Sequence, residues 1–239
     1  MKNLIVLLFA AIVGLYGCYT FNSNLSAKKI IQDNYSIQLF AQAVDRSGVT
    51  FATGFAINED HVVTVGHFCV PLVEGETAEL FNEKDVHMVY VDFFGQTATK
   101  GGFEVIAVDE YNDTCLLRKR RHGIRPVRFI DRKEHVDMGD RIAISGGPLG
   151  IYPSVSFGHI TNPDEILRKI GVISGNNRMV LTVDTCAGNS GSPVILIDEG
   201  VVVGMVYAGP GKVCSNLSYA VTAKQIKRFL IENGQQFLE

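Results

Sequence analysis

The feature that most constrains the fold of this chain is a long succession of short apolar segments separated by turn residues. The segments are rich in Val, Ile and Phe, and clusters of Gly, Asn and Asp lie between them. Segments of this length and composition favour strands, and many short strands with such turns are typical of β-sandwiches and β-barrels. The predicted strands are residues 36–44, 49–57, 61–65, 86–94, 103–108, 114–117, 141–145, 179–183, 193–197, 201–207 and 217–221.

One segment near the C-terminus departs from this pattern. Residues 222–232 have helical spacing, with Ile226, Phe229 and Leu230 on one face, and Asn233-Gly234 follows as a stop signal. We therefore expect an all-β fold that ends in a single helix.

Composition narrows the class of protein. The chain has 239 residues, of which 46% are hydrophobic and 20% charged, so it can bury a substantial core. Its net charge is −3. The one dense basic cluster, Arg118–Arg121, has too few charges for a nucleic-acid partner and is expected to be a solvated loop or strand end. No pair of cysteines has zinc-finger spacing, so no metal is expected.

The N-terminus differs from the rest of the chain. A short basic start leads into the apolar stretch Leu4–Gly17, which is typical of a secretory signal. The ending Leu15-Tyr-Gly-Cys18 resembles a bacterial lipobox, in which Cys18 carries a lipid, although Tyr16 departs from that pattern. An ordinary cleaved signal and an uncleaved anchor stay open, because Leu4 to Phe21 just reaches the ~18 apolar residues of a spanning helix. Under each alternative the rest of the chain is exported. We interpret residues 19–35 as a tether that leads into the exported domain.

Serine-based chemistry is indicated by the segment Gly188-Asn-Ser190-Gly-Ser-Pro193. Glycines around a nucleophile permit a tight turn that aims the amides of Gly188 and Ser190 at one point, as an oxyanion hole requires. A serine hydroxyl is a poor nucleophile unless a base and an orienting carboxylate activate it. The sequence supplies a candidate for each role.

The candidate base is His67 and the candidate carboxylate is Asp113. An apolar strand delivers His67 into a glycine-containing turn, which favours it over the other histidines. Asp113 follows a polar turn and precedes Thr-Cys-Leu-Leu, a buried-strand pattern, which favours it over Asp109. The competing histidines are His61, His87, His122, His135 and His159.

Gly-Asn-Ser-Gly-Ser-Pro, with Thr64-Val-Gly-His67 and Asn112-Asp113-Thr-Cys-Leu-Leu, resembles the catalytic motifs of trypsin-like serine proteases. The motifs are most similar to bacterial glutamyl-endopeptidases and Deg-type members, and the similarity covers about residues 36–232. It implies two six-stranded antiparallel β-barrels with the active site between them, and a protease domain over residues 36–239. It also implies attack by Ser190 with His67 as base, Asp113 as orienting group and no cofactor.

The resemblance also assigns a substrate pocket. Asp184 lies at the offset that favours Arg or Lys substrates in trypsin, and Tyr207 and Gly209 are assigned to substrate binding. Relatives with an Asp at this offset do not always cut after basic residues, and Leu217 would crowd the pocket. Glutamate preference is disfavoured by Val206. Cys186 and Cys214 lie where the family places a disulfide that braces the pocket.

Two further expectations concern activation and redox state. Asn189 stands where zymogen-type trypsins have an Asp that pairs with a newly cut N-terminus, so we expect activity without that cleavage. Cys69 and Cys115 either pair with each other or remain free buried thiols.

The sequence therefore predicts an exported, membrane-tethered, monomeric serine endopeptidase that acts on proteins or peptides and has no nucleic-acid partner. A secreted form is the alternative location. A catalytically idle, peptide-binding member of the fold is the alternative function, and a host-interaction or surface-exclusion lipoprotein is a third hypothesis.

Overall fold

A computed structural model describes residues 36–42, 49–70, 103–118, 124–131, 135–163, 178–209 and 213–239. Several predicted features lie outside these residues: the signal segment with Cys18, the tether over residues 19–35, and the strand predicted over residues 86–94. Within the described residues, no helix has both the length and the apolar composition needed to span a bilayer.

The N-terminal half forms a five-stranded antiparallel sheet with the strand order β1-β2-β3-β5-β4. A single helical turn, α2 (Gly66–Cys69), follows β3 where the sequence predicts only a turn. The strands of this sheet are β1 (Ile37–Gln42), β2 (Val49–Ala56), β3 (His61–Thr64), β4 (Glu104–Asp109) and β5 (Thr114–Arg118).

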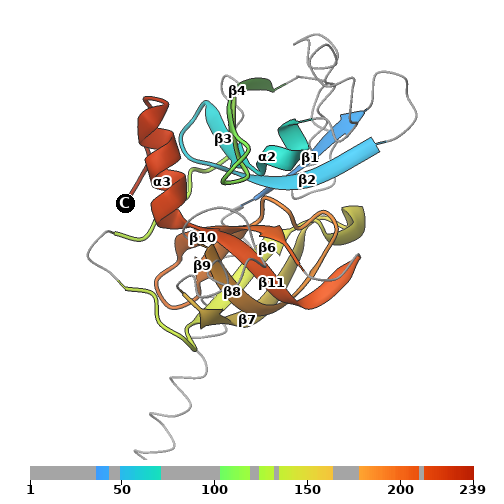
Figure 1. Ribbon diagram of the computed structural model, residues 1–239, viewed down its shortest axis with the longest axis vertical. Helices are drawn as coiled ribbons and strands as arrows, with labels where there is room; N and C mark the ends of the chain where they lie inside the picture. Colours follow the sequence, from blue (N-terminus) through green and yellow to red (C-terminus); the bar gives the residue numbers. More distant parts are fainter. Residues whose placement is uncertain are drawn as a thin grey trace, which may run out of the picture.

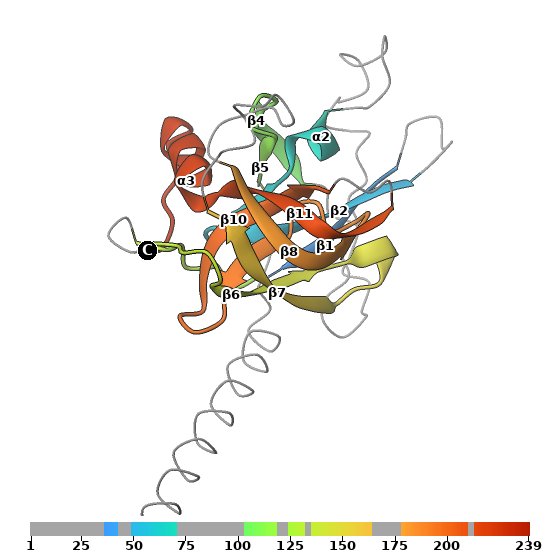
Figure 2. The same cartoon turned by 60° about the horizontal axis from the view of Figure 1, so that its bottom comes forward.

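The C-terminal half is a closed antiparallel barrel with the order β10-β11-β8-β7-β6-β9, which lies against the sheet (Figures 1 and 2). The described residues thus contain one closed six-stranded barrel and one five-stranded sheet, whereas the resemblance implies two six-stranded barrels. The barrel strands are β6 (Arg141–Gly146), β7 (Ser154–Asn162), β8 (Arg178–Cys186), β9 (Pro193–Leu196), β10 (Val201–Ala208) and β11 (Cys214–Thr222).

Most strands coincide with the apolar segments of the sequence, but β7 is not among the predicted strands. Its sequence, Ser154-Val-Ser-Phe-Gly-His-Ile-Thr-Asn162, mixes polar and apolar residues. Phe157 and His159 are exposed, and only Ile160 is buried, so the strand lacks the apolar run by which its neighbours are recognised.

The core is continuous across both halves, and α3 (Ala223–Glu232) closes it on one side. The Thr222 hydroxyl caps this helix by accepting a hydrogen bond from the Gln225 amide at 3.4 Å. Ile226, Phe229 and Leu230 are buried, as the spacing predicts, and α3 contacts β5 of the sheet as well as β10 and β11 of the barrel (Figure 1). The two halves are therefore packed together as well as linked by the chain.

Candidate active site

His67 lies in the short helix that follows the buried strand β3. Gly66 permits a close approach to the next hairpin, because a Cβ atom at this position would lie 3.1 Å from the Thr114 amide nitrogen. The imidazole remains accessible, with 38% of the His67 side chain exposed. The sequence motif thus places a half-exposed imidazole beside the β4–β5 turn.

Asp113 occupies that turn and receives two hydrogen bonds from His67. The backbone amide of His67 donates to Oδ1 at 2.7 Å, and Nδ1 lies 2.8 Å from Oδ2. Because a carboxylate accepts hydrogen bonds, this contact assigns the proton of a neutral imidazole to Nδ1 and leaves Nε2 as the basic nitrogen. The structure brings these two predicted residues together, while Asp109 instead binds the backbone amide and the side chain of Asn112 at 3.0 and 2.6 Å.

A disulfide joins Cys69 to Cys115. Cys69 lies two residues after His67, and Cys115 lies two residues after Asp113. The sequence left open whether these cysteines are bonded to each other or are free thiols, and the structure contains the disulfide. The covalent bond joins the segments that carry His67 and Asp113.

Ser190 lies in a tight loop between β8 and β9, at the boundary of the two halves. Gly191 has φ +88°, and a Cβ atom there would lie 1.7 Å from the Thr53 carbonyl oxygen, so only glycine fits. The Thr53 amide donates to the Ser190 carbonyl at 2.7 Å, which ties the loop to β2. In the described part of the chain, the Ser190 hydroxyl donates to the Tyr207 carbonyl at 3.4 Å rather than to His67.

The same loop contains Gly188 and Ser190, whose amides are assigned from the sequence to an oxyanion hole. Gly188 has φ +98°, and among the described residues neither its amide nor that of Ser190 donates to another group. The Gly188 carbonyl is held by the buried Thr53 hydroxyl at 2.7 Å, and that hydroxyl accepts a hydrogen bond from the Gly147 amide at 3.2 Å. Thr53 lies in a predicted strand, but its supporting role is not evident from the sequence, because it depends on a contact between distant segments.

Asn189 is buried inside the same loop. Its side-chain oxygen accepts a hydrogen bond from the Cys186 amide at 3.0 Å. The neutral side-chain amide thus stabilises the loop from within.

The predicted pocket residues lie at the ends of β8, β10 and β11. Cys186 and Cys214 form the expected disulfide. Asp184 is exposed, whereas the next residue, Thr185, is buried with its hydroxyl 2.5 Å from that of Ser218. Tyr207 is half-buried and Gly209 is exposed, and a Cβ atom at Gly209 would lie 3.3 Å from the Leu217 carbonyl oxygen.

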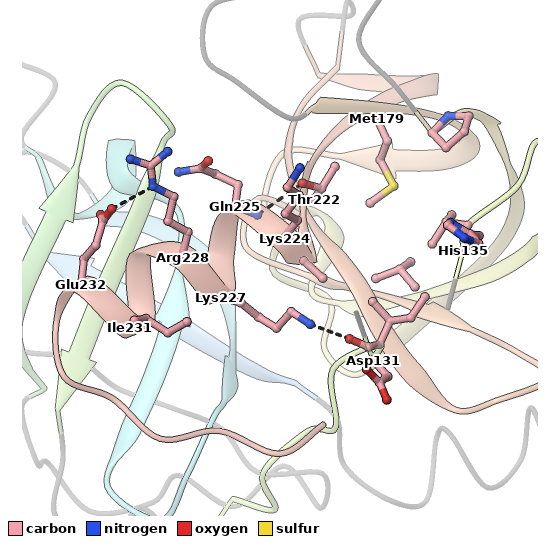
Figure 3. A pocket seen from close by; sticks show the side chains of 15 residues that line it. Asp131, His135, Met179, Thr222, Lys224, Gln225, Lys227, Arg228, Ile231 and Glu232 are labelled. Carbon is pink, nitrogen blue, oxygen red and sulfur yellow. Dashed lines mark hydrogen bonds and ion pairs between the residues drawn. The ribbon is translucent and has the colours of Figure 1, made fainter. Parts of the chain in front are cut away.

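A separate cavity of about 880 Å³ lies beside α3 (Figure 3). Its walls include His135, Met179 and Lys227, and none of the predicted catalytic or pocket residues lines it.

In the described ranges, no three His, Cys, Asp or Glu side chains gather as metal ligands. His61, the other histidine of this half that is described, bonds Asn58 at 3.0 Å, and burial lowers its pKa.

Comparison with known proteins identifies relatives that are similar in sequence. "Serine protease HTRA1" of Xenopus laevis is 27% identical over 131 residues, which are 54% of this chain and 28% of that protein. "Serine protease HTRA1B" of Danio rerio is 24% identical over 86% of this chain and 40% of its own length. "Magnetosome formation protease MamE" of Paramagnetospirillum magneticum is 25% identical over 81% of this chain and 25% of its own length. The chain thus spans well under half of the curated relatives it matches.

Solved structures agree on the fold. The Rv3671c protease from M. tuberculosis, in its active form, matches with a TM-score of 0.64 and 18% identity over 87% of this chain and 84% of that one. The HtrA-type protease AlgW with tripeptide matches with a TM-score of 0.63 and 16% identity over 84% of this chain and 62% of that one. The family model of the trypsin-like peptidase domain matches residues 52–205, which include the histidine, the aspartate and the serine described above. The chain therefore belongs to the trypsin-like peptidase family.

Proposed function

We propose that this protein is a serine endopeptidase in which Ser190, His67 and Asp113 act as a catalytic triad. The observation that carries the proposal is the pair of hydrogen bonds from His67 to the Asp113 carboxylate, at 2.7 and 2.8 Å. These bonds fix both the orientation and the tautomer of the imidazole, which are the two properties that a general base for serine requires.

The proposed reaction uses only groups of the chain and water. Ser190 Oγ attacks a peptide carbonyl while His67 Nε2 takes the hydroxyl proton, and Asp113 stabilises the resulting imidazolium. The amides of Gly188 and Ser190 donate to the carbonyl oxygen as it becomes negative. His67 then gives the proton to the leaving amine, and water hydrolyses the acyl-enzyme to regenerate Ser190. The Ser190 hydroxyl must rotate from the Tyr207 carbonyl to reach His67, and such contacts often tighten only when substrate binds.

The exposure of Asp184 supports a preference for substrates with uncharged side chains. A charged pocket floor would require a shielded carboxylate, but Asp184 is exposed, and the buried pair beside it, Thr185 and Ser218, is neutral. We therefore propose cleavage after uncharged residues, in place of the Arg or Lys preference considered from the sequence. A panel of peptides that differ only at the residue before the cleaved bond tests this, and faster cleavage after Arg or Lys would contradict it.

Fold, location and assembly are also part of the proposal. We infer a fold of two six-stranded barrels, as the family resemblance implies, and an exported protein held at the membrane through residues 1–18, with Cys18 as the lipid site. We further propose that it acts as a monomer on protein or peptide substrates.

Hydrolysis of an unfolded protein such as casein tests the activity. The full chain should release peptides, and Ser190→Ala should release none while keeping the same thermal midpoint. A folded wild type without hydrolysis would instead favour the alternative of an idle, peptide-binding member of the family.

A further inference from the structure

Arg178 is a buried cation at the boundary between the two halves of the molecule. It begins β8 of the barrel, and only 2% of the residue is exposed. Burying a guanidinium is costly unless acceptors surround it. The partners of Arg178 therefore indicate what the protein gains from this arrangement.

One set of partners belongs to the turn that carries Asp113. Arg178 Nη1 donates to the Asn112 carbonyl at 2.9 Å, and Nη2 donates to the Tyr111 carbonyl at 3.4 Å. These are the two residues immediately before Asp113. Asp113 has φ +53°, in the left-handed region that a residue other than glycine adopts at a cost, so the turn needs support from outside.

Another partner belongs to the strand behind Ser190. The guanidinium carbon of Arg178 lies 4.2 Å from the centroid of the Tyr207 ring, in a cation–π contact. The carbonyl of Tyr207 is the group that accepts the Ser190 hydroxyl. A single buried side chain thus contacts the turn that precedes Asp113 in the sequence and also contacts Tyr207, whose carbonyl accepts the Ser190 hydroxyl.

We propose that Arg178 is a positioning residue that holds the Asp113 turn of the sheet in register with the barrel that carries Ser190; this inference rests on the proposed triad. Asp113 and Ser190 belong to different halves, so a small shift between them would misalign the proton transfer, and a misplacement of about 1 Å can cost about 10²-fold in rate. Arginine suits the role because its planar fork binds two carbonyls while its face stacks on a ring, which lysine cannot reproduce.

The test compares Arg178→Met and Arg178→Lys with a matched control. Lys227 is the other buried cation among the described residues, with 5% exposure, and it lies on α3 (Figure 3). Its Nζ donates to the Ile130 carbonyl at 2.7 Å and to the Glu239 carboxylate at 2.8 Å. Arg178→Met should lower kcat by about tenfold or more with KM changed by less than about threefold, and Arg178→Lys should lie between it and wild type. Lys227→Met should lower the thermal midpoint without changing kcat. An equal loss of kcat in Lys227→Met would mean that general destabilisation is the cause and would overturn the proposal.

A second comparison asks whether Arg178 acts through Asp113. The rate of labelling by a fluorophosphonate is measured for Arg178→Met in the wild-type and the Asp113→Asn backgrounds. Groups that act as one unit are non-additive, so the effect of Arg178→Met should shrink to less than about twofold in the Asp113→Asn background. A loss of tenfold or more in both backgrounds would overturn the positioning role.

The same assay separates this inference from the proposed function. Absence of Ser190-dependent labelling in folded wild type would refute the triad itself, whereas strong labelling in both wild type and Arg178→Met would refute only the role of Arg178. If Arg178→Met does not fold, Arg178→Lys, which keeps the buried charge, provides the same comparison.

Discussion

Removal of the Cys69–Cys115 disulfide should cost the folded state about 4 kcal/mol. The two cysteines are 46 residues apart in the sequence. Closing a loop of that length in the unfolded chain removes about 13 to 14 cal/mol/K of entropy, which corresponds to about 4 kcal/mol at 25 °C. The Cys186–Cys214 disulfide, with a separation of 28 residues, gives about 3.6 kcal/mol by the same relation and therefore serves as a matched control.

The two disulfides should differ in their effect on activity. The hydrogen bonds from His67 to Asp113 do not themselves involve Cys69 or Cys115, so we expect kcat of Cys69→Ala/Cys115→Ala to stay within about tenfold of wild type at 25 °C. The control pair, Cys186→Ala/Cys214→Ala, should chiefly raise KM, because it lies beside the residues proposed to bind substrate.

Urea unfolding of the oxidised protein and of both double variants measures these free energies, and peptide hydrolysis measures kcat and KM. A change below about 1 kcal/mol for Cys69→Ala/Cys115→Ala would show that the disulfide does not stabilise the fold through chain entropy, since it lies well under the value of about 4 kcal/mol. Detection of free thiols at both positions in unreduced, unfolded protein would also refute it.

Three further predictions concern Thr53, Gly188 and His61. Thr53→Val removes the hydroxyl that donates to the Gly188 carbonyl in the proposed oxyanion hole. We therefore expect kcat to fall by about tenfold or more in steady-state assays, and an unchanged kcat would argue against that support. Gly188→Ala should abolish fluorophosphonate labelling, because its Cβ would lie 2.3 Å from the Gly147 carbonyl oxygen; normal labelling would contradict the loop geometry. Burial lowers the pKa of folded His61, so its contribution to stability is present above the unfolded-state pKa of about 6.5 and is lost as the pH falls. Wild type should therefore lose more unfolding free energy than His61→Gln between neutral and mildly acidic pH, and parallel curves would refute this.

The sequence predicts this fold well where strands are buried. In β9 and β10 successive residues are buried, so both faces of each strand pack in the core and the apolar composition alone predicts a strand. Strand β7 escapes prediction because barrel closure, rather than its own apolar content, makes it a strand.

The candidate site divides in the same way. His67, Asp113 and Ser190 lie in local motifs that are visible in the sequence, and the partner of His67 is Asp113 rather than Asp109, as the motif predicts. The supporting groups are not visible in the sequence, because Thr53 and Arg178 act across 135 and 66 residues of chain, respectively. An arginine at the head of an apolar strand resembles an ordinary strand end until its burial is known.

The triad is tested most directly by labelling of the full chain with a fluorophosphonate probe, in wild type, Ser190→Ala and His67→Ala. Wild type should be labelled strongly and both variants should not, because Ser190 is nucleophilic only when His67 removes its proton. Labelling that persists in His67→Ala at the wild-type rate, or a folded wild type that is not labelled, would show that these residues do not form the proposed triad.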